Sequence, residues 1–307
     1  MTATMRDWQD SLRGGDPGTA RLSPPETVIV LLDGSEESRA ALPVAKHFAE
    51  LQRATLHVVS TGEPQAEARY VLDQLRLTPE DVRGAVLDRL QQAPDEAVLN
   101  VAQTCPAPLI TLSTHAIGED TQAIVGQLAE NVLTKAPAQK APAQLLLVAP
   151  DRGRHPWVIR RIVLAHDGSP TADAAIAPTA DLAKRAGADV IALHVAARKA
   201  SQDVEPGSLP APRYLDQPQH EWPSWASEFV QRMMALGASP AAVNFKLLVT
   251  GGQPGSEIAQ FARDNNADLV VATWRGQWDP EHAGTLKVLV RRSGCPVLLI
   301  TGAQQNP

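Results

Sequence analysis

Two Asp-Gly-Ser triplets are the part of this sequence that most readily suggests chemistry. Their aspartates, Asp33 and Asp167, each follow an apolar run and lie 134 residues apart (167 − 33). A carboxylate at the end of a buried strand can accept hydrogen bonds from a nucleobase or a ribose. The same triplet is also common as a turn that starts a helix, because Asp and Ser bond to nearby backbone amides and Gly tolerates left-handed conformations. The triplets alone leave both interpretations open.

A second candidate element lies near the end of the chain. The apolar run LVVAT at 269–273 is followed by Gly276 and then by Gly284 and Thr285, which we expect to open a helix. Glycines let a backbone approach a phosphate closely, and the amides at a helix start donate to it together with a Thr hydroxyl. Asp167 and these glycines would frame a crevice of nucleotide size.

The apolar pattern predicts the elements that hold these residues. Runs with the length of buried strands alternate with amphipathic helical segments, in the same order in both halves. Strands are expected at 28–32, 55–60, 82–90, 108–113, 145–149, 162–165, 189–195, 243–249, 268–273 and 297–301. Helices are expected at about 40–48, 66–76, 94–103, 122–135, 172–185, 225–236, 256–263 and 285–292. This alternation predicts right-handed crossovers and parallel sheets.

A repeat of this length indicates a duplicated domain rather than a short structural repeat. With 307 residues and 44% hydrophobic content, the chain is long enough for two cores. We predict a disordered tail at 1–25, a first domain at 26–152 and a second at 158–302. The Pro-rich segment 198–224 interrupts the second domain, and a lid, an oligomer contact and a tolerated insertion are all open interpretations of it.

Composition disfavours several classes of protein. The net charge of −6, from 28 Lys and Arg against 34 Asp and Glu, disfavours a nucleic-acid partner. No apolar run approaches the length that spans a membrane, so a membrane partner is not expected. Two isolated cysteines, Cys105 and Cys295, indicate a reducing compartment, and we expect a cytoplasmic protein. His57 and His194, which we place at matching strand positions, are expected to be hydrogen-bonded core residues rather than catalysts. No Cys or paired acid joins His115, His166 or His282 at a spacing that suggests a metal site.

The motifs taken together resemble those of the universal stress protein family. An apolar strand with Asp-Gly-Ser occurs in both halves, as does a later Leu-His-Val, at 56–58 and 193–195, and a Gly-containing helix before Cys-Pro-Val closes the second half. The resemblance implies an α/β fold of two tandem Rossmann-like domains, each a five-stranded parallel sheet with helices on both faces. It also implies that the two domains pair through their last strands, and that ATP, with Mg, is a candidate ligand.

The same resemblance implies which residues would bind the nucleotide. In the second domain these are Ala165, His166, Asp167, Val195, Ala272, Thr273, Gly276, Gly284, Thr285 and Leu286. Asp167 would hold the base or ribose, and Gly276, Gly284 and Thr285 the phosphates. In the first domain the corresponding residues are Asp33, Val58 and Gly126.

The sequence departs from the family's nucleotide motif in both halves. Thr273 stands where the motif has its first Gly, and seven residues rather than nine separate Gly276 from Gly284. Trp274 and Trp278 are bulky for a loop that contacts phosphate. In the first half only Gly126 remains, followed by Gln127 instead of a hydroxyl residue. Any ATP is therefore expected mainly in the second domain.

The resemblance implies a nucleotide-binding regulatory module of the stress response rather than an enzyme. The alternative is a stress protein that binds no nucleotide and acts through protein–protein interaction. A homodimer is open in either case. An ATP hydrolase is disfavoured because the sequence offers no catalytic base or pair of metal-binding carboxylates near the loop, although weak ATP hydrolysis stays open.

Overall fold

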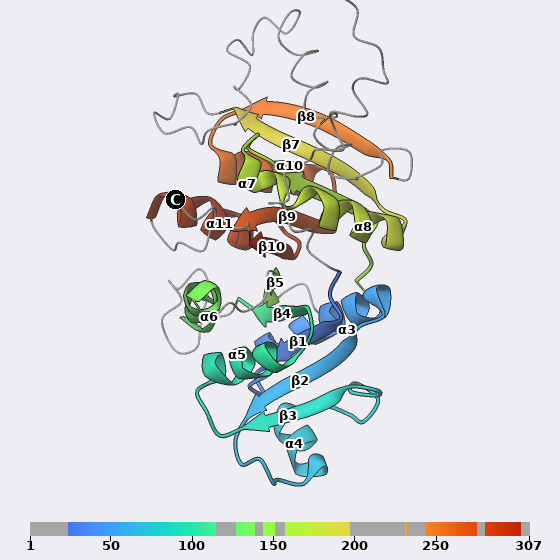
Figure 1. Ribbon diagram of the computed structural model, residues 1–307, viewed down its shortest axis with the longest axis vertical. Helices are drawn as coiled ribbons and strands as arrows, with labels where there is room; N and C mark the ends of the chain where they lie inside the picture. The colour runs from blue at the N-terminus through green and yellow to red at the C-terminus, as the bar shows by residue number, and fades with distance from the viewer. Residues whose placement is uncertain are drawn as a thin grey trace, which may run out of the picture.

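The computed structural model describes residues 24–114, 127–138, 144–150, 157–196, 231, 243–274 and 280–301. Strands and helices alternate along the chain in both halves (Figure 1). The first half contains β1 (Thr27–Leu31), α2 (Glu36–Arg39), α3 (Ala41–Gln52), β2 (Thr55–Thr61), α4 (Ala68–Leu75), β3 (Val86–Leu90), α5 (Pro94–Thr104), β4 (Pro108–Ser113), α6 (Gln127–Ala138) and β5 (Gln144–Val148). The second contains β6 (Arg161–Ala165), α7 (Pro170–Asp173), α8 (Ile176–Ala186), β7 (Asp189–Ala196), β8 (Phe245–Gly251), α10 (Pro254–Asp264), β9 (Leu269–Trp274), α11 (Pro280–Arg292) and β10 (Val297–Thr301).

The described strands form one continuous sheet in the order β3-β2-β1-β4-β5-β10-β9-β6-β7-β8. Neighbouring strands within each half are parallel, whereas β5 and β10 are antiparallel, with Leu146 opposite Leu298. Figure 1 shows the two halves one above the other with β5 and β10 between them. The predicted α/β fold and the predicted pairing of the halves through their last strands are confirmed.

Helices cover both faces of this sheet, and side chains alternate between the two faces along each strand, as strand geometry requires. On one face, even-numbered residues of β1 such as Val28 and Val30 pack with α3, α4 and α8. On the other, Ile29 and Leu31 pack with α5, α6, α10 and α11. Each of the two hydrophobic clusters contains residues from both halves, so the core continues across the junction.

An aromatic contact joins the halves on the α3 and α8 face. Trp157, which precedes β6, stacks on Phe48 of α3 with ring centroids 5.6 Å apart, and His47 meets its ring edge-on at 5.5 Å. The indole N–H of Trp157 donates to the carbonyl of Asp268 at 3.1 Å, which ties the same side chain to the second half. Trp157 therefore contacts both halves at once.

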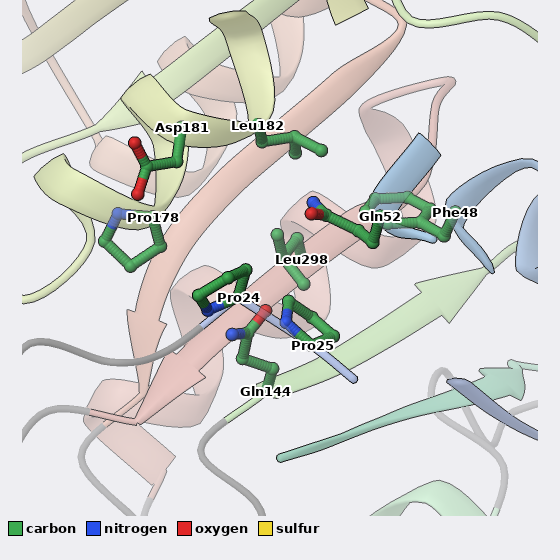
Figure 2. Close-up of a pocket in the computed structure, with 9 residues that line it drawn as sticks. All are labelled: Pro24, Pro25, Phe48, Gln52, Gln144, Pro178, Asp181, Leu182 and Leu298. Atoms are coloured by element: carbon green, nitrogen blue, oxygen red, sulfur yellow. The ribbon is translucent and has the colours of Figure 1, made fainter. Parts of the chain in front are cut away.

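A pocket lies beside this contact, between the halves (Figure 2). Its wall comes from α3, α8, β5, β10 and the segment before β1: Pro24, Pro25, Phe48, Gln52, Gln144, Pro178, Asp181, Leu182 and Leu298. Pro25 is buried there, although it falls at the end of the predicted disordered tail. None of the lining residues belongs to the predicted nucleotide site, so this pocket is separate from it.

Several predictions concern residues that the structure leaves out of its description. Residues 1–23 of the predicted tail, the insertion at 198–224 and all but one residue of the helix predicted at 225–236 lie outside the described ranges. Among the described helices, none has both the length and the apolar character needed to cross a membrane.

Candidate functional site at the carboxyl edge of the second half

The strand order reverses between β6 and β9, which are neighbours in the sheet. In open parallel sheets, ligands bind beyond the carboxyl ends of the strands at such a reversal. Asp167 follows β6 at this edge, Thr273 lies near the end of β9, and continuation of the β6–β7 register places Val195 opposite Asp167. The structure therefore brings together three predicted site residues that are far apart in the sequence.

Each Asp-Gly-Ser triplet forms a tight turn that begins a helix. In the second half, the backbone N–H and the hydroxyl of Ser169 donate to Asp167 Oδ1 at 2.9 and 2.6 Å, and Ser169 Oγ accepts from the Ala172 amide. Ser35 makes the same two bonds to Asp33 at the same distances. The central glycines of the two triplets, Gly168 and Gly34, have φ of +82° and +85°, respectively, which glycine adopts without strain. Both aspartates are nevertheless exposed at the sheet edge, so the turn interpretation and the ligand interpretation are compatible.

His166, predicted to contact the ligand, directs its side chain into the protein. Its Nδ1 accepts from the Gly168 amide at 3.0 Å, so the ring proton lies on Nε2, which faces Asp173 Oδ1 at 3.1 Å. The His166 side chain is fully buried. His166 thus holds the turn and α7 in place, while the neighbouring Asp167 faces solvent.

His194 supports the same turn from β7. Its Nδ1–H donates to the carbonyl of His166 at 2.9 Å, and the side chain is buried. Burial lowers the pKa of His194 below its ordinary value of 6.5; the hydrogen bond to the His166 carbonyl opposes this effect, and the His166 ring adds to it. The imidazole is therefore held in its neutral form beneath the candidate site.

Acidification should destabilise the protein through His194. Above about pH 6.5 the ring is neutral in both states, and below that value the unfolded chain binds the proton first, so the free energy of unfolding falls. In urea titrations between about pH 7 and 5, the wild type should lose up to about 1.4 kcal/mol per pH unit more than His194→Gln. His47, whose pKa is lowered by burial, is common to both proteins and cancels. Equal pH slopes for the two proteins would contradict this assignment.

Helix α11 begins earlier than the sequence analysis predicted. It starts at Pro280, four residues before Gly284. Because the amide of residue i in an α-helix donates to the carbonyl of residue i−4, the amides of Gly284 and Thr285 are used inside the helix. The prediction that these two residues open the helix is therefore wrong. The signal for the earlier start was Asp279-Pro280, since Pro is favoured at the first helical position.

Two glycines define the surroundings of this helix. A Cβ added to Gly255 of α10 would lie 3.1 Å from Thr285 Cα and 3.0 Å from Val288 Cβ, so the absence of a side chain lets α10 and α11 pack closely. Among the described residues, nothing lies within 4 Å of a Cβ added to Gly284. The described residues therefore leave space beside Gly284, whereas Thr285 is half-buried against α10 and Leu286 is buried in the core.

Comparison with known proteins bears on the half of the chain that carries this edge. Residues 159–301 match the model of the universal stress protein family. This half of the chain belongs to the universal stress protein family. A search of curated proteins gave no significant match to the chain.

Solved structures extend the comparison to the whole chain. A universal stress protein from Archaeoglobus fulgidus is 14% identical, with a TM-score of 0.59 over 93% of this chain and 100% of its own. A putative universal stress protein from Pseudomonas aeruginosa is 17% identical, with a TM-score of 0.58 over 91% and 94%. The cytoplasmic domain of a prokaryotic cation chloride cotransporter is 13% identical, with a TM-score of 0.55 over 92% and 98%. Identities this low support the fold alone.

The register of the first half differs from the prediction at the Leu-His-Val motif. In the first half Thr27 pairs with Thr55, and continuing this register places Thr61 opposite Asp33 at the strand end. In the second half Arg161 pairs with Asp189, and the same continuation places Val195 opposite Asp167. The assignment of His57 and His194 to matching positions is wrong, because His57 lies three residues earlier along its strand. Val58 is buried in the middle of β2, and Thr61 occupies the position predicted for it. Gly126 lies outside the described residues.

Trp274 does not fill the crevice of the universal stress protein domain. It is the last residue of β9, and its side chain is buried with Leu286 and Leu289 of α11. The bulky side chain thus belongs to the core beneath the helix, while Ala272 and Thr273 are partly exposed near the strand end. Gly276 and Trp278 lie outside the described residues.

The described part of the chain contains no group of three or more His, Cys, Asp or Glu side chains arranged to hold a metal ion.

Proposed function

We propose that the universal stress protein domain in the second half binds an adenine nucleotide, ATP, at the carboxyl edge between β6 and β9. One observation carries the proposal. The exposed carboxylate of Asp167 lies at the strand-order reversal, on a turn that Ser169, His166 and His194 hold in place. A fixed, solvent-facing acceptor at that point suits the hydroxyls of a ribose or the amino group of a base.

The residues on the base side of the site fit this ligand. Asp167 would accept from the base or ribose. Ala165, at the end of the same strand β6, and Val195, on the neighbouring β7, present no large exposed side chain there. The open space beside Gly284 supports the approach of a ligand to α11. Because the amides of Gly284 and Thr285 are used within the helix, the phosphates would lie against the first turn of α11, next to these residues. Magnesium would accompany the nucleotide.

ATP bound at this edge would serve regulation rather than turnover. Bound ATP can change the affinity for another partner only if it binds one conformational state of the protein more tightly than another. The continuous core across β5 and β10 would connect the second half to the first. The division into domains at 26–152 and 158–302, a homodimer and a cytoplasmic location stay predictions.

The alternative function is that of a protein-interaction module without a nucleotide. The early start of α11 favours it, because the two backbone amides expected to donate to phosphate are already paired. The partial motif of the first half, with Gly126 followed by Gln127, favours it too.

Calorimetric titration with ATP and magnesium tests the proposal on the wild type, Gly284→Ala and Gly284→Glu. The Ala variant should be more stable by about 0.5–1 kcal/mol, because Ala is the better helix former and its Cβ would meet none of the described residues. It should also bind ATP more weakly, since that Cβ occupies space the ligand needs. Gly284→Glu places a carboxylate there and should abolish binding.

Gln260→Glu, at an exposed position of the adjacent helix α10, adds the same charge away from the edge and should leave binding unchanged. No heat with the wild type, or unchanged affinity in Gly284→Glu, would reject the nucleotide proposal and favour the interaction module.

A further inference from the structure

A second group of reactive side chains lies in the first half, far along the chain from Asp167. His57 of β2 places its Nδ1 2.6 Å from Asp88 Oδ2 of β3, and its Nε2 4.0 Å from the Sγ atom of Cys105. Cys105 directly follows α5, which packs on β1 and β2. Three elements therefore bring a thiol, an imidazole and a carboxylate together.

The hydrogen bonds fix the orientation and protonation of His57. A carboxylate only accepts hydrogen bonds, so at 2.6 Å the proton between His57 and Asp88 is donated by Nδ1. Nε2 then carries the lone pair of the neutral ring, and this lone pair faces the thiol of Cys105. This is the arrangement in which a base removes a proton from a nucleophile while a carboxylate orients the base.

The surroundings keep Cys105 protonated until it reacts. Burial raises the pKa of the Cys105 thiol, and the charge of Asp88 adds to this effect. The thiol also lies at the C-terminal end of α5, where the helix dipole disfavours an anion. Hydrogen bonding by the side chains of Thr104 and Thr27 acts in the opposite direction. A thiol in such surroundings needs a neighbouring base to become a nucleophile.

We propose that Cys105, His57 and Asp88 form a nucleophilic thiol site for small hydroperoxides. His57 Nε2 takes the thiol proton as Sγ attacks the terminal oxygen of the hydroperoxide and its O–O bond breaks. The leaving oxygen receives the proton from His57 and departs as water or an alcohol. Sulfur is oxidised to a sulfenic acid and the hydroperoxide is reduced by the same two electrons. An external low-molecular-weight thiol would restore Cys105.

The competing interpretation is structural, with His57 and Asp88 merely joining the edge strand β3 to β2 and Cys105 ending α5. The other cysteine provides an internal reference. Cys295 is buried in the core with Trp274 and Leu286, so it should react slowly in the folded protein whatever His57 does. Cys105 is only partly buried and is therefore more accessible than Cys295.

The test treats the full-length protein with hydrogen peroxide in the presence of dimedone, which traps sulfenic acid, and follows each cysteine peptide by mass spectrometry. Cys105 should be labelled much faster than Cys295. His57→Gln should slow Cys105 labelling by about 100-fold at neutral pH, because the thiol loses its neighbouring base. Asp88→Asn should slow labelling of Cys105 less than His57→Gln does.

A purely structural role predicts the opposite direction, because loss of the His57–Asp88 contact would loosen β3 and expose the thiol. Labelling of Cys105 in both variants at the wild-type rate or faster would therefore overturn the proposal, as would labelling of wild-type Cys105 no faster than in the urea-unfolded chain. Neither result depends on nucleotide binding in the second half.

Discussion

Asp167→Ala should weaken ATP binding by about 10- to 100-fold, if the carboxylate accepts a hydrogen bond from the base or ribose. Hydrogen bonds to charged groups contribute about 1.5–3 kcal/mol, and each 1.4 kcal/mol corresponds to a tenfold change in affinity. Asp167→Asn should weaken binding less, because an amide oxygen still accepts from the Ser169 amide and preserves the turn. Calorimetric dissociation constants for the three proteins measure both effects.

The first half supplies a matched control for this prediction. Asp33→Ala removes an aspartate whose bonds to Ser35 have the same lengths, 2.9 and 2.6 Å, as those of Asp167 to Ser169. The two Ala variants therefore lose the same turn contacts, and only one of them loses the proposed ligand contact. Equal losses of ATP affinity in the two variants, or none in either, would show that Asp167 does not bind the nucleotide.

The antiparallel β5–β10 ladder should make the stability of the two halves interdependent. Leu146 and Leu298 lie opposite each other across the junction, at 0% and 2% exposure. Replacing either by Ala should reduce the free energy of unfolding by about 2–5 kcal/mol, since each leaves a cavity in the shared core. The double variant should differ from the sum of the single variants by about 0.5–3 kcal/mol, as expected for residues in contact.

Leu193 of β7 supplies the control pair with Leu146. It is equally buried, but four strand spacings, about 19 Å, separate β7 from β5 in the sheet. Effects of Leu146→Ala and Leu193→Ala on the free energy of unfolding should therefore add within about 0.5 kcal/mol. Guanidinium titrations of all variants give these values. If the effects of Leu146→Ala and Leu298→Ala on the free energy of unfolding also add, the halves are energetically independent.

The sequence allowed the architecture to be predicted because its signals were local and repeated. Apolar runs of strand length, each followed by an amphipathic segment, give parallel βα units without knowledge of tertiary contacts. The Asp-Gly-Ser turns were predictable for the same reason, since their hydrogen bonds span only two or three residues. Pairing of β5 with β10 was implied by resemblance to a family and not by residue pattern.

The parts that could not be predicted depend on register and packing. Leu-His-Val occurs in both halves, but strand pairing places His57 and His194 three residues apart along equivalent strands. A repeated tripeptide carries no information about which residue lies opposite it in the sheet. Burial of Trp274 depends on where α11 lies, and α11 begins at a Pro whose signal was outweighed by the glycines of the expected motif.

The cluster of Cys105, His57 and Asp88 could not be predicted from the sequence either. The three residues come from β2, β3 and the end of α5, separated by 31 and 48 positions from His57. Their spacing matches no local motif, and only the β2–β3 register together with the packing of α5 brings them together. A function that depends on such a cluster becomes visible only in the folded chain.

The number of ATP molecules bound per chain tests the central claim most directly. Equilibrium dialysis of the full-length protein against labelled ATP and magnesium should give one site per chain, because Asp167 faces an open edge beside Gly284 and the first half retains only part of the motif. Saturation at one molecule per chain is the result predicted here. Saturation at two molecules of equal affinity, or no binding at millimolar ATP, would contradict the assignment of a nucleotide site to the second half.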